Sequence, residues 1–374
     1  MRTTSPKISL LLTGGGARAA YQVGVLKAIA EWYPRVHHSP FTIYSGTSAG
    51  AINAMALACY ASSFRLGVKK LEWIWSRLHS RRIFATSPTG MLGFLGHQWF
   101  ARLQAHHHAR PPFGLLNNRP LRHLLNQVNN YNRIEKQISA GNLHGIAITA
   151  SSYKSGDSVS FFQGQNSIEP WDRARSKGRR TLLNTDHLLA SAAIPIVFPA
   201  TRIGQAYYGD GSIHQLAPLR PSLKMGADKI LIIDLINQKL EQPDHTRAPG
   251  LAALGGHLMD TIFSDTLAAD LENLSRTNTL LGNFSPSEQK QHKMRIIDHI
   301  LLCPSKSFEP LARAHYGQLP PMTRTLMRLI GISPKDDAAI TSYLLFEPGY
   351  IQALIDMGYE DTLEHEAILR HFLN

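Results

Sequence analysis

Two glycine-containing turns lie close together in the first fifty residues, and each follows a short apolar run. Residues 7–13 (KISLLLT) read as a buried strand that leads into Gly14, Gly15 and Gly16, and a helical pattern follows over residues 17–32. A second apolar run, 41–44, leads into GTSAG at 46–50, which fits the pattern G-x-S-x-G. In that pattern a sharp strand-to-helix turn exposes a serine hydroxyl. The sequence therefore predicts two strand–turn–helix units, with Ser48 as a candidate nucleophile.

Strand and helix patterns alternate through the first 235 residues, which predicts an α/β fold with a largely parallel sheet. A catalytic domain is expected over 7–236, with an irregular, lid-like insertion at about 80–119, and a mainly helical extension over 237–374. The expected helices are 17–32, most of 49–78, 121–138, 185–193, 251–281 and most of 320–374 with a break near 330–335; the expected strands are 7–13, 41–44, 144–150 paired with 158–163, 229–235 and 295–303.

Composition limits the classes of protein to consider. The chain has 374 residues, 43% of them hydrophobic, which is enough for a substantial core. Two cysteines make neither a disulfide framework nor a zinc cluster. No secretory signal is visible, and the longest largely apolar segment, 188–200, is shorter than the roughly 20 residues of a membrane span. A soluble, cytoplasmic protein is therefore expected, with membrane contact at most peripheral.

The net charge of +12 favours polyanionic partners such as an anionic lipid surface or nucleic acid. The densest basic segment is 173–180 (RARSKGRR), which is interpreted first as a solvated loop without a dedicated partner. A lipid-facing role is the alternative. Nucleic-acid binding is not expected, because no zinc-finger spacing, aromatic RNA-binding motif or basic zipper accompanies the charge.

The glycine turn at 14–16 is open to three interpretations. As a dinucleotide fingerprint it has Gly14 and Gly16, with Ala19 in the third glycine position, but no acidic residue follows at the required spacing. As a phosphate loop it lacks the G-K-[ST] ending. As an oxyanion hole it is well suited, because unhindered amides at a helix N-terminus point donors at a developing negative charge. A tight turn without chemistry is the remaining alternative.

A serine nucleophile needs a base within hydrogen-bond reach. Asp210 lies between two glycines in YYGDGS, at residues 207–212, where an exposed turn would present its carboxylate to a distant loop. A solvated turn aspartate is the ordinary explanation for an Asp-Gly pair. Of 18 histidines, His187 and His214 are the candidates for a triad, although neither has a supporting neighbour. The run 106–108 (HHH) is interpreted as exposed loop and not as a metal site.

Taken together, these motifs resemble the patatin-like phospholipases. That family combines a G-G-G-x-R-G loop, a G-x-S-x-G elbow, an A-S-x-x-x-P segment and a D-G-[GA] turn. This chain carries all four in the same order, as GGGAR at 14–18, GTSAG at 46–50, ASAAIP at 190–195 and Asp210-Gly211. Further similarity lies in APL at 217–219, SYLLF at 342–346 and MGY at 357–359, so the resemblance covers nearly the whole chain.

The resemblance implies a three-layer sandwich, with a central, mostly parallel sheet flanked by helices and a mainly helical C-terminal region. It also implies a Ser-Asp dyad, with Ser48 as nucleophile and Asp210 as base. Gly14, Gly15 and Gly16 would form the oxyanion hole, supported by Arg18 and Ala49, with no metal and no cofactor. Two positions depart from the family pattern: Ala19 replaces a glycine inside the helix, and Ser212 replaces the glycine or alanine that follows the aspartate turn.

The predicted function is that of a lipid acyl hydrolase of phospholipase A type, which cleaves acyl esters through an acyl-serine intermediate at an anionic membrane surface. Apolar residues of the 91–100 segment are expected to form an interfacial lip or, alternatively, an ordinary buried cluster; these are Phe94, Leu95, Trp99 and Phe100. Two rival functions stay open. One is a general serine esterase or thioesterase with a histidine-assisted triad, and the other is a catalytically silent lipid-binding relative.

Overall fold

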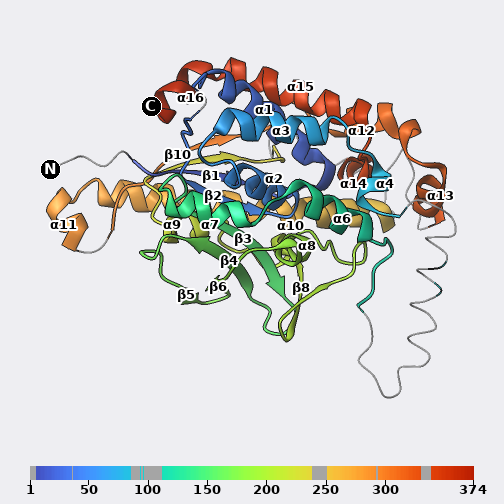
Figure 1. The fold of residues 1–374 in the computed structure, drawn as a ribbon, viewed down its shortest axis with the longest axis horizontal. Coiled ribbons are helices and arrows are strands. Elements are labelled where there is room, and N and C mark those ends of the chain that lie inside the picture. The colour runs from blue at the N-terminus through green and yellow to red at the C-terminus, as the bar shows by residue number, and fades with distance from the viewer. Residues whose placement is uncertain are drawn as a thin grey trace.

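The computed structural model of the chain describes residues 6–35, 37–85, 93, 96, 112–237, 251–291, 294–329 and 338–374. The expected lip at 91–100, apart from its two described glycines, and the histidine run at 106–108 lie outside these residues. So does the polar segment 238–250. Figure 1 shows a twisted sheet with helices along both of its faces.

Five parallel strands form the centre of the sheet, in the order β10-β9-β1-β2-β3. Their bounds are β10 Asp298–Leu302, β9 Lys229–Ile233, β1 Ile8–Leu12, β2 Ile43–Thr47 and β3 Gly145–Ser152. Beyond β3 the sheet becomes mixed: β4 (Ser158–Gly164) and β8 (Ala206–Asp210) both pair antiparallel with β3. The predicted antiparallel pair at 144–163 is therefore confirmed, and so is the mostly parallel sheet.

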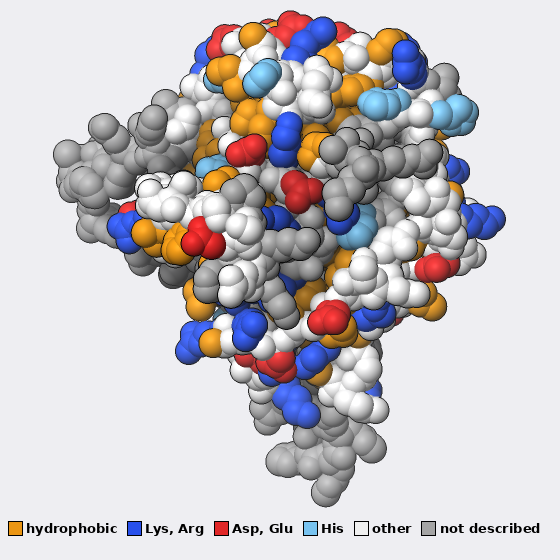
Figure 2. All heavy atoms as spheres, turned by 90° about the vertical axis from the view of Figure 1, so that its left-hand side faces the viewer, with side chains coloured by type: hydrophobic (Ala, Val, Ile, Leu, Met, Phe, Trp, Pro, Cys, Tyr) orange, Lys and Arg blue, Asp and Glu red, His pale blue; other side chains and the backbone are white. Residues whose placement is uncertain are grey.

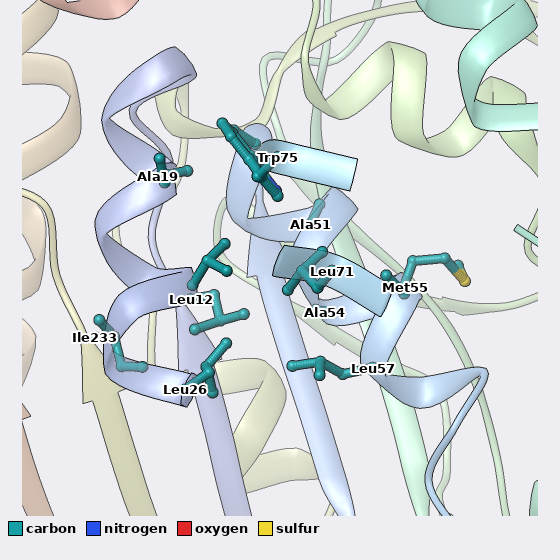
Figure 3. Close-up of a cluster of buried hydrophobic side chains, with 14 of the residues drawn as sticks. Leu12, Ala19, Leu26, Ala51, Ala54, Met55, Leu57, Leu71, Trp75 and Ile233 are labelled. Carbon is teal, nitrogen blue, oxygen red and sulfur yellow. The ribbon is translucent and has the colours of Figure 1, made fainter. Parts of the chain in front are cut away.

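Both faces of the central sheet must be covered by helices. The reason is that successive side chains of a strand point in opposite directions, and the central strands are apolar at successive positions. Leu10 and Leu12 of β1 pack into one hydrophobic cluster together with α1 (Ala20–Glu31), α2 (Ala49–Ala58) and α3 (Phe64–Trp75). Leu11 points into a second cluster on the opposite face, with α10 (Leu251–Leu281). Figure 3 shows the first cluster between β1, α1, α2 and α3. The three-layer architecture follows from this alternation.

The C-terminal part packs on the same core as the N-terminal part. Its helices are α13 (Pro321–Leu329), α14 (Ala338–Leu344), α15 (Pro348–Glu364) and α16 (Glu366–Leu373). Figure 1 shows α15 lying along α1. A Cβ atom on Gly24 or on Gly358 would collide with backbone of the other helix, so the two helices approach each other at glycines. The side chains of Leu345, Tyr350 and Leu354 belong to the same cluster as β1 and α1.

The segment 173–180 is not the solvated loop that was expected. It forms β5 (Trp171–Arg173) and β6 (Ser176–Arg180), and β6 pairs with β4 at the edge of the sheet. Lys177 forms an ion pair with Asp157 at 2.8 Å, and Arg180 donates to the backbone carbonyls of Gly164, Gln165 and Ile168. Charge density misled the prediction, because an edge strand with one solvated face can carry charged side chains.

The remaining described helices and strands lie between the elements already named. They are η1 Gly16–Ala19, α4 Ser80–Ile83, α6 Arg119–Val128, α7 Asn132–Ser139, α8 Thr185–Ser191, β7 Thr201–Ile203, η2 Gly211–Ile213, α9 Arg220–Lys224, α11 Pro286–Gln291, α12 Glu309–His315 and η3 Tyr316–Gln318. Within the described part of the chain, no helix is both long enough and apolar enough to cross a bilayer. On the face that Figure 2 shows, basic and acidic side chains are dispersed among one another.

Candidate active site

Ser48 occupies a strained turn between β2 and α2. Its backbone angles are φ 55° and ψ −127°, a conformation that L residues rarely adopt. The flanking glycines are required by packing: a Cβ on Gly46 would collide with the backbone of Gly50, and one on Gly50 with the carbonyl oxygens of Leu12 and Thr13. The G-x-S-x-G pattern thus places the serine at a turn that only glycines on both sides permit.

Ser191 holds this turn from the neighbouring α8. Its hydroxyl accepts a hydrogen bond of 2.8 Å from the backbone amide of Ser48 and donates one of 2.6 Å to the carbonyl of Thr149 in β3. All three residues are buried. The A-S-x-x-x-P segment therefore contributes a hydroxyl that fixes the elbow, a role that the pattern alone did not indicate.

The glycine loop lies beside the elbow, between β1 and the helical segment η1–α1. Gly16 has a φ of 55°, and a Cβ there would collide with the carbonyl oxygen of Tyr343. Within the described part of the chain, the amides of Gly14, Gly15 and Gly16 donate to no protein acceptor. These amides are available as donors at the start of a helical segment, which is the arrangement an oxyanion hole needs.

Arg18 joins the glycine loop to the C-terminal part. Its side chain is buried, with the guanidinium carbon 3.9 Å from the centre of the Tyr343 ring. Nε donates to the hydroxyl of Ser342 at 2.7 Å, and Nη1 donates to the hydroxyl of Tyr343 at 3.1 Å. Arg18 therefore anchors the loop to α14 and is not presented to solvent.

A chain of buried polar side chains lies behind the loop. The amide of Gln22 donates to the carbonyl of Thr13 at 2.9 Å, and Asn53 of α2 donates to the carbonyl of Ala19 and to Gln22. The indole of Trp75 donates to Asn53 at 2.8 Å. This network ties the oxyanion-type loop to the helix that follows Ser48. Ala19, which departs from the family pattern, is accommodated at the end of η1.

Asp210 is the last residue of β8. The pairing of β8 with β3 places this residue near the turn that holds Ser48. Residue 210 is opposite Ala150 in β3, and Thr47 of β2 is opposite the adjacent Thr149 on the same edge of β3, because β4 pairs along the other edge. Asp210 Oδ1 accepts from the amide of Ser212 at 3.0 Å. Within the described residues, the buried Oδ2 has no hydrogen bond of ordinary geometry.

Burial raises the pKa of the Asp210 carboxyl to about 6, and the side chain of Ser48 is the first of the groups that oppose this rise. The hydroxyl and the carboxyl are thus close enough to interact, although they are far apart in sequence. Ser212 also lowers the pKa of Asp210 through its backbone amide and its side chain. The serine that departs from the family pattern therefore supports the carboxylate form.

Neither candidate histidine has a triad geometry. His187 completes a capping box at the start of α8, with Nδ1 2.8 Å from Oδ1 of Asn184, and burial lowers its pKa to about 4. His214 follows η2, and its amide donates to the hydroxyl of Ser151 at 3.1 Å. Its buried Nδ1 has no hydrogen-bond partner among the described residues.

An apolar pocket, partly open to solvent, begins at Ser48 and Gly16. Its walls come from α2, α3, α4, α6, the segment 192–198 after α8 and the segment 343–346, and they are almost entirely hydrocarbon. Principal wall residues are Ile52, Ala56, Leu71, Trp75, Leu121, Leu125, Phe198 and Phe346. The sequence offered no local signal for this pocket, because its walls meet only in the folded chain.

Residues 10–223 match the model of the patatin-like phospholipase family. The chain belongs to that family. The match covers more than half of the chain and includes the glycine loop, the elbow, the A-S-x-x-x-P segment and the Asp210 turn. The predicted resemblance is therefore confirmed.

Solved structures similar to this patatin-like protein include human GIVD cytosolic phospholipase A2, at 12% identity over 98% of this chain and 60% of that one, with a TM-score of 0.44. VipD from Legionella pneumophila aligns at 12% identity over 96% of this chain and 66% of that one, with a TM-score of 0.36. The type III effector ExoU of Pseudomonas aeruginosa aligns at 16% identity over 88% and 70%, with a TM-score of 0.29. The chain thus spans about two thirds of these proteins or less. No curated protein matches it in sequence.

Proposed function

We propose that this patatin-like protein hydrolyses acyl esters of lipids, with phospholipase A-type cleavage of glycerophospholipids or neutral esters. One observation carries the proposal: Ser48 lies between a buried carboxylate and an apolar pocket. Burial keeps the pKa of Asp210 near 6, high enough to accept a proton and low enough to be ionised at neutral pH. The pocket offers an acyl chain a hydrocarbon surface.

The reaction proceeds in two steps. The Ser48 hydroxyl attacks the ester carbonyl carbon while its proton passes to Asp210; the ester bond then breaks, and the alcohol leaves with that proton. A water molecule gives a proton to Asp210, attacks the acyl-serine and releases the fatty acid as Ser48 recovers its hydrogen. In both steps the negative oxygen is held by amides of Gly14, Gly15 and Gly16, each donor contributing roughly 3 kcal/mol. Ala49 follows the nucleophile and begins α2 beside this oxygen.

The catalytic domain is proposed to span residues 7–236, with 237–374 as the extension that closes the site. Docking on an anionic membrane surface is the proposed route to substrate. The net charge of +12 favours it. Ile196 supports it further: this side chain is 65% exposed and is held at a φ of 69°, between Ile194 and Phe198, which both line the pocket.

The decisive test compares four proteins on a panel of phospholipid and neutral acyl esters: wild type, Ser48→Ala, Asp210→Asn and His214→Gln. We expect the first two substitutions to reduce hydrolysis by at least a thousandfold and His214→Gln to leave it within a few fold. Loss of activity in His214→Gln with survival in Asp210→Asn would identify a histidine-assisted esterase instead. Failure of a fluorophosphonate probe to label Ser48 in the wild type would identify a catalytically silent relative.

A further inference from the structure

The apolar pocket runs along α2 and α6, away from Ser48. Ala49, Ile52 and Ala56 line it from α2, at the spacing that places side chains on one helical face. Leu121, Leu124, Leu125 and Val128 line it from α6 at the same kind of spacing. The pocket therefore extends away from Ser48 along the axis of α2.

The far end of the pocket lies where α2 and α6 end. The thiol of Cys59, just beyond α2, is 3.5 Å from the carbonyl of Asn130, and Lys70 donates to the carbonyl of Val128 at 2.6 Å. Asn129 caps the C-terminus of α6 at this place and lines the pocket. Ser48 and Asn129 thus mark its two ends.

Asn129 is the exception in a hydrocarbon wall. Its side chain is 93% buried, since only 7% of its surface is exposed. Within the described part of the chain, neither its amide nitrogen nor its amide oxygen has a hydrogen bond of ordinary geometry. A buried amide without partners is costly, so such a group indicates an absent partner.

The phenol of Tyr131 is a polar neighbour of this amide, although no hydrogen bond of ordinary geometry joins the two. Burial raises the pKa of Tyr131, and the side chains of Thr185 and Asn129 are among those that oppose the rise, so the amide lies near this phenol. The phenol oxygen already accepts from Thr185 at 2.9 Å. Thr185 also bonds to Asn126. Asn129 is therefore the member of a small polar cluster that lines the otherwise apolar pocket.

The distance between the two ends sets a chain length. Ala56 is eight residues from Ser48 and Cys59 is eleven, which at 1.5 Å per residue corresponds to about 12 to 16 Å. Carbon–carbon bonds of about 1.5 Å that alternate in direction advance by about 1.3 Å each. An extended acyl chain that starts at Ser48 would reach the polar end after about nine to twelve carbons.

We propose that this pocket selects medium-length acyl chains that carry a hydroxyl group at their far end. The inference rests on the proposed function, because it takes Ser48 as the site of acylation. A hydroxyl donates one hydrogen bond and accepts others, which matches the free oxygen and the free NH₂ group of Asn129. An unsubstituted chain of the same length would bring a methyl group against that amide and leave the amide unpaired.

The test uses p-nitrophenyl esters of butyrate, decanoate, ω-hydroxydecanoate and hexadecanoate with wild type, Asn129→Leu and Gln127→Leu. Gln127 is the matched control, because it carries an amide at the end of the same helix but is exposed. We expect wild type to prefer ω-hydroxydecanoate over decanoate by about tenfold in kcat/KM. Asn129→Leu should reverse this preference, and Gln127→Leu should keep it.

A second variant tests the length. Ala56→Phe fills the pocket midway, so it should reduce kcat/KM for both ten-carbon esters by about tenfold or more relative to the butyrate ester. Equal rates on decanoate and ω-hydroxydecanoate in wild type would overturn the hydroxyl preference, and a clear preference for hexadecanoate would overturn the length. Either result with active enzyme leaves the proposed function intact, whereas no turnover of any ester and no fluorophosphonate labelling would reject the proposed function itself.

Discussion

The backbone amide of Ser48 donates to the hydroxyl of Ser191 across 2.8 Å, and this bond joins the elbow to the segment that precedes Pro195. Ser191→Ala would leave a buried amide without an acceptor. We expect a loss of about 1–3 kcal/mol in the free energy of unfolding. We also expect kcat to fall by about tenfold to a hundredfold, because the nucleophile is no longer held in place. Chemical denaturation and ester hydrolysis measure the two effects.

Ser222→Ala is the control for Ser191→Ala. Ser222 is equally buried, and its hydroxyl bonds to the hydroxyls of Ser9 and Ser45 at 2.8 and 3.0 Å. A comparable loss of stability with unchanged kcat is expected there. If both variants lost activity in proportion to stability, the special role of Ser191 would be rejected.

The pH dependence of activity should follow Asp210, which in the proposed mechanism must be ionised to accept the proton of Ser48. Burial raises its pKa to about 6. Therefore kcat/KM should be constant at neutral pH and fall about tenfold for each pH unit below 6. A pH–rate profile on a short-chain ester measures this. A midpoint near 7 that disappears in His214→Gln would point to a histidine base.

Asp234 predicts a pH dependence of stability. It follows β9, and its Oδ1 accepts from the hydroxyl of Thr13 and from the amide of Leu235, both at 2.8 Å. Burial raises its pKa from 3.8 to about 6, so folding favours the protonated form. This contribution to stability is complete below pH 3.8 and is lost as the pH rises to about 6.

Asp234→Asn removes this titration. We compare the free energy of unfolding of the variant with that of wild type at each pH. This difference should shift in favour of the variant by up to about 3 kcal/mol between pH 4 and pH 8, because each pKa unit is worth about 1.4 kcal/mol. Urea denaturation at the two pH values measures the difference. The same pH dependence in both proteins would show that Asp234 titrates normally.

Arg18→Lys tests the anchor between the glycine loop and α14. An ammonium group cannot reproduce both the planar stacking on Tyr343 and the separate hydrogen bonds to Ser342 and Tyr343. We expect a loss of about 2 kcal/mol in the free energy of unfolding, together with reduced kcat. Arg65→Lys, at an exposed position on α3, should change neither. Full stability in Arg18→Lys would reject the anchoring role.

The elements that local patterns encode were predicted well. The elbow follows from glycines at 46 and 50, because backbone packing at both positions excludes a side chain. The strands 144–150 and 158–163 pair as expected around a short turn. Asp210 was a candidate base because it lies between two glycines, and the family resemblance then assigned it that role, since an Asp-Gly pair by itself indicates an ordinary turn.

The pocket and its polar end could not be predicted, because their residues meet through long-range packing. Ala56, Leu125 and Phe346 are ordinary apolar residues in the sequence, and Asn129 lies inside the single helix that was expected over 121–138, whereas in the structure it ends α6. The segment 173–180 was predicted wrongly for a related reason. Its pairing partner, β4, supplies the structure that the charged sequence itself does not indicate.

The carbonyl of Tyr343 rests against Gly16, and the segment around it closes one wall of the pocket. Residues 10–223, which define the family, are therefore not a self-sufficient unit in this protein. A truncated version ending there would keep the serine and the aspartate but would uncover the guanidinium of Arg18 and open the apolar pocket sideways to solvent. Anyone who wishes to transplant or shorten this protein must carry its last helices along with it.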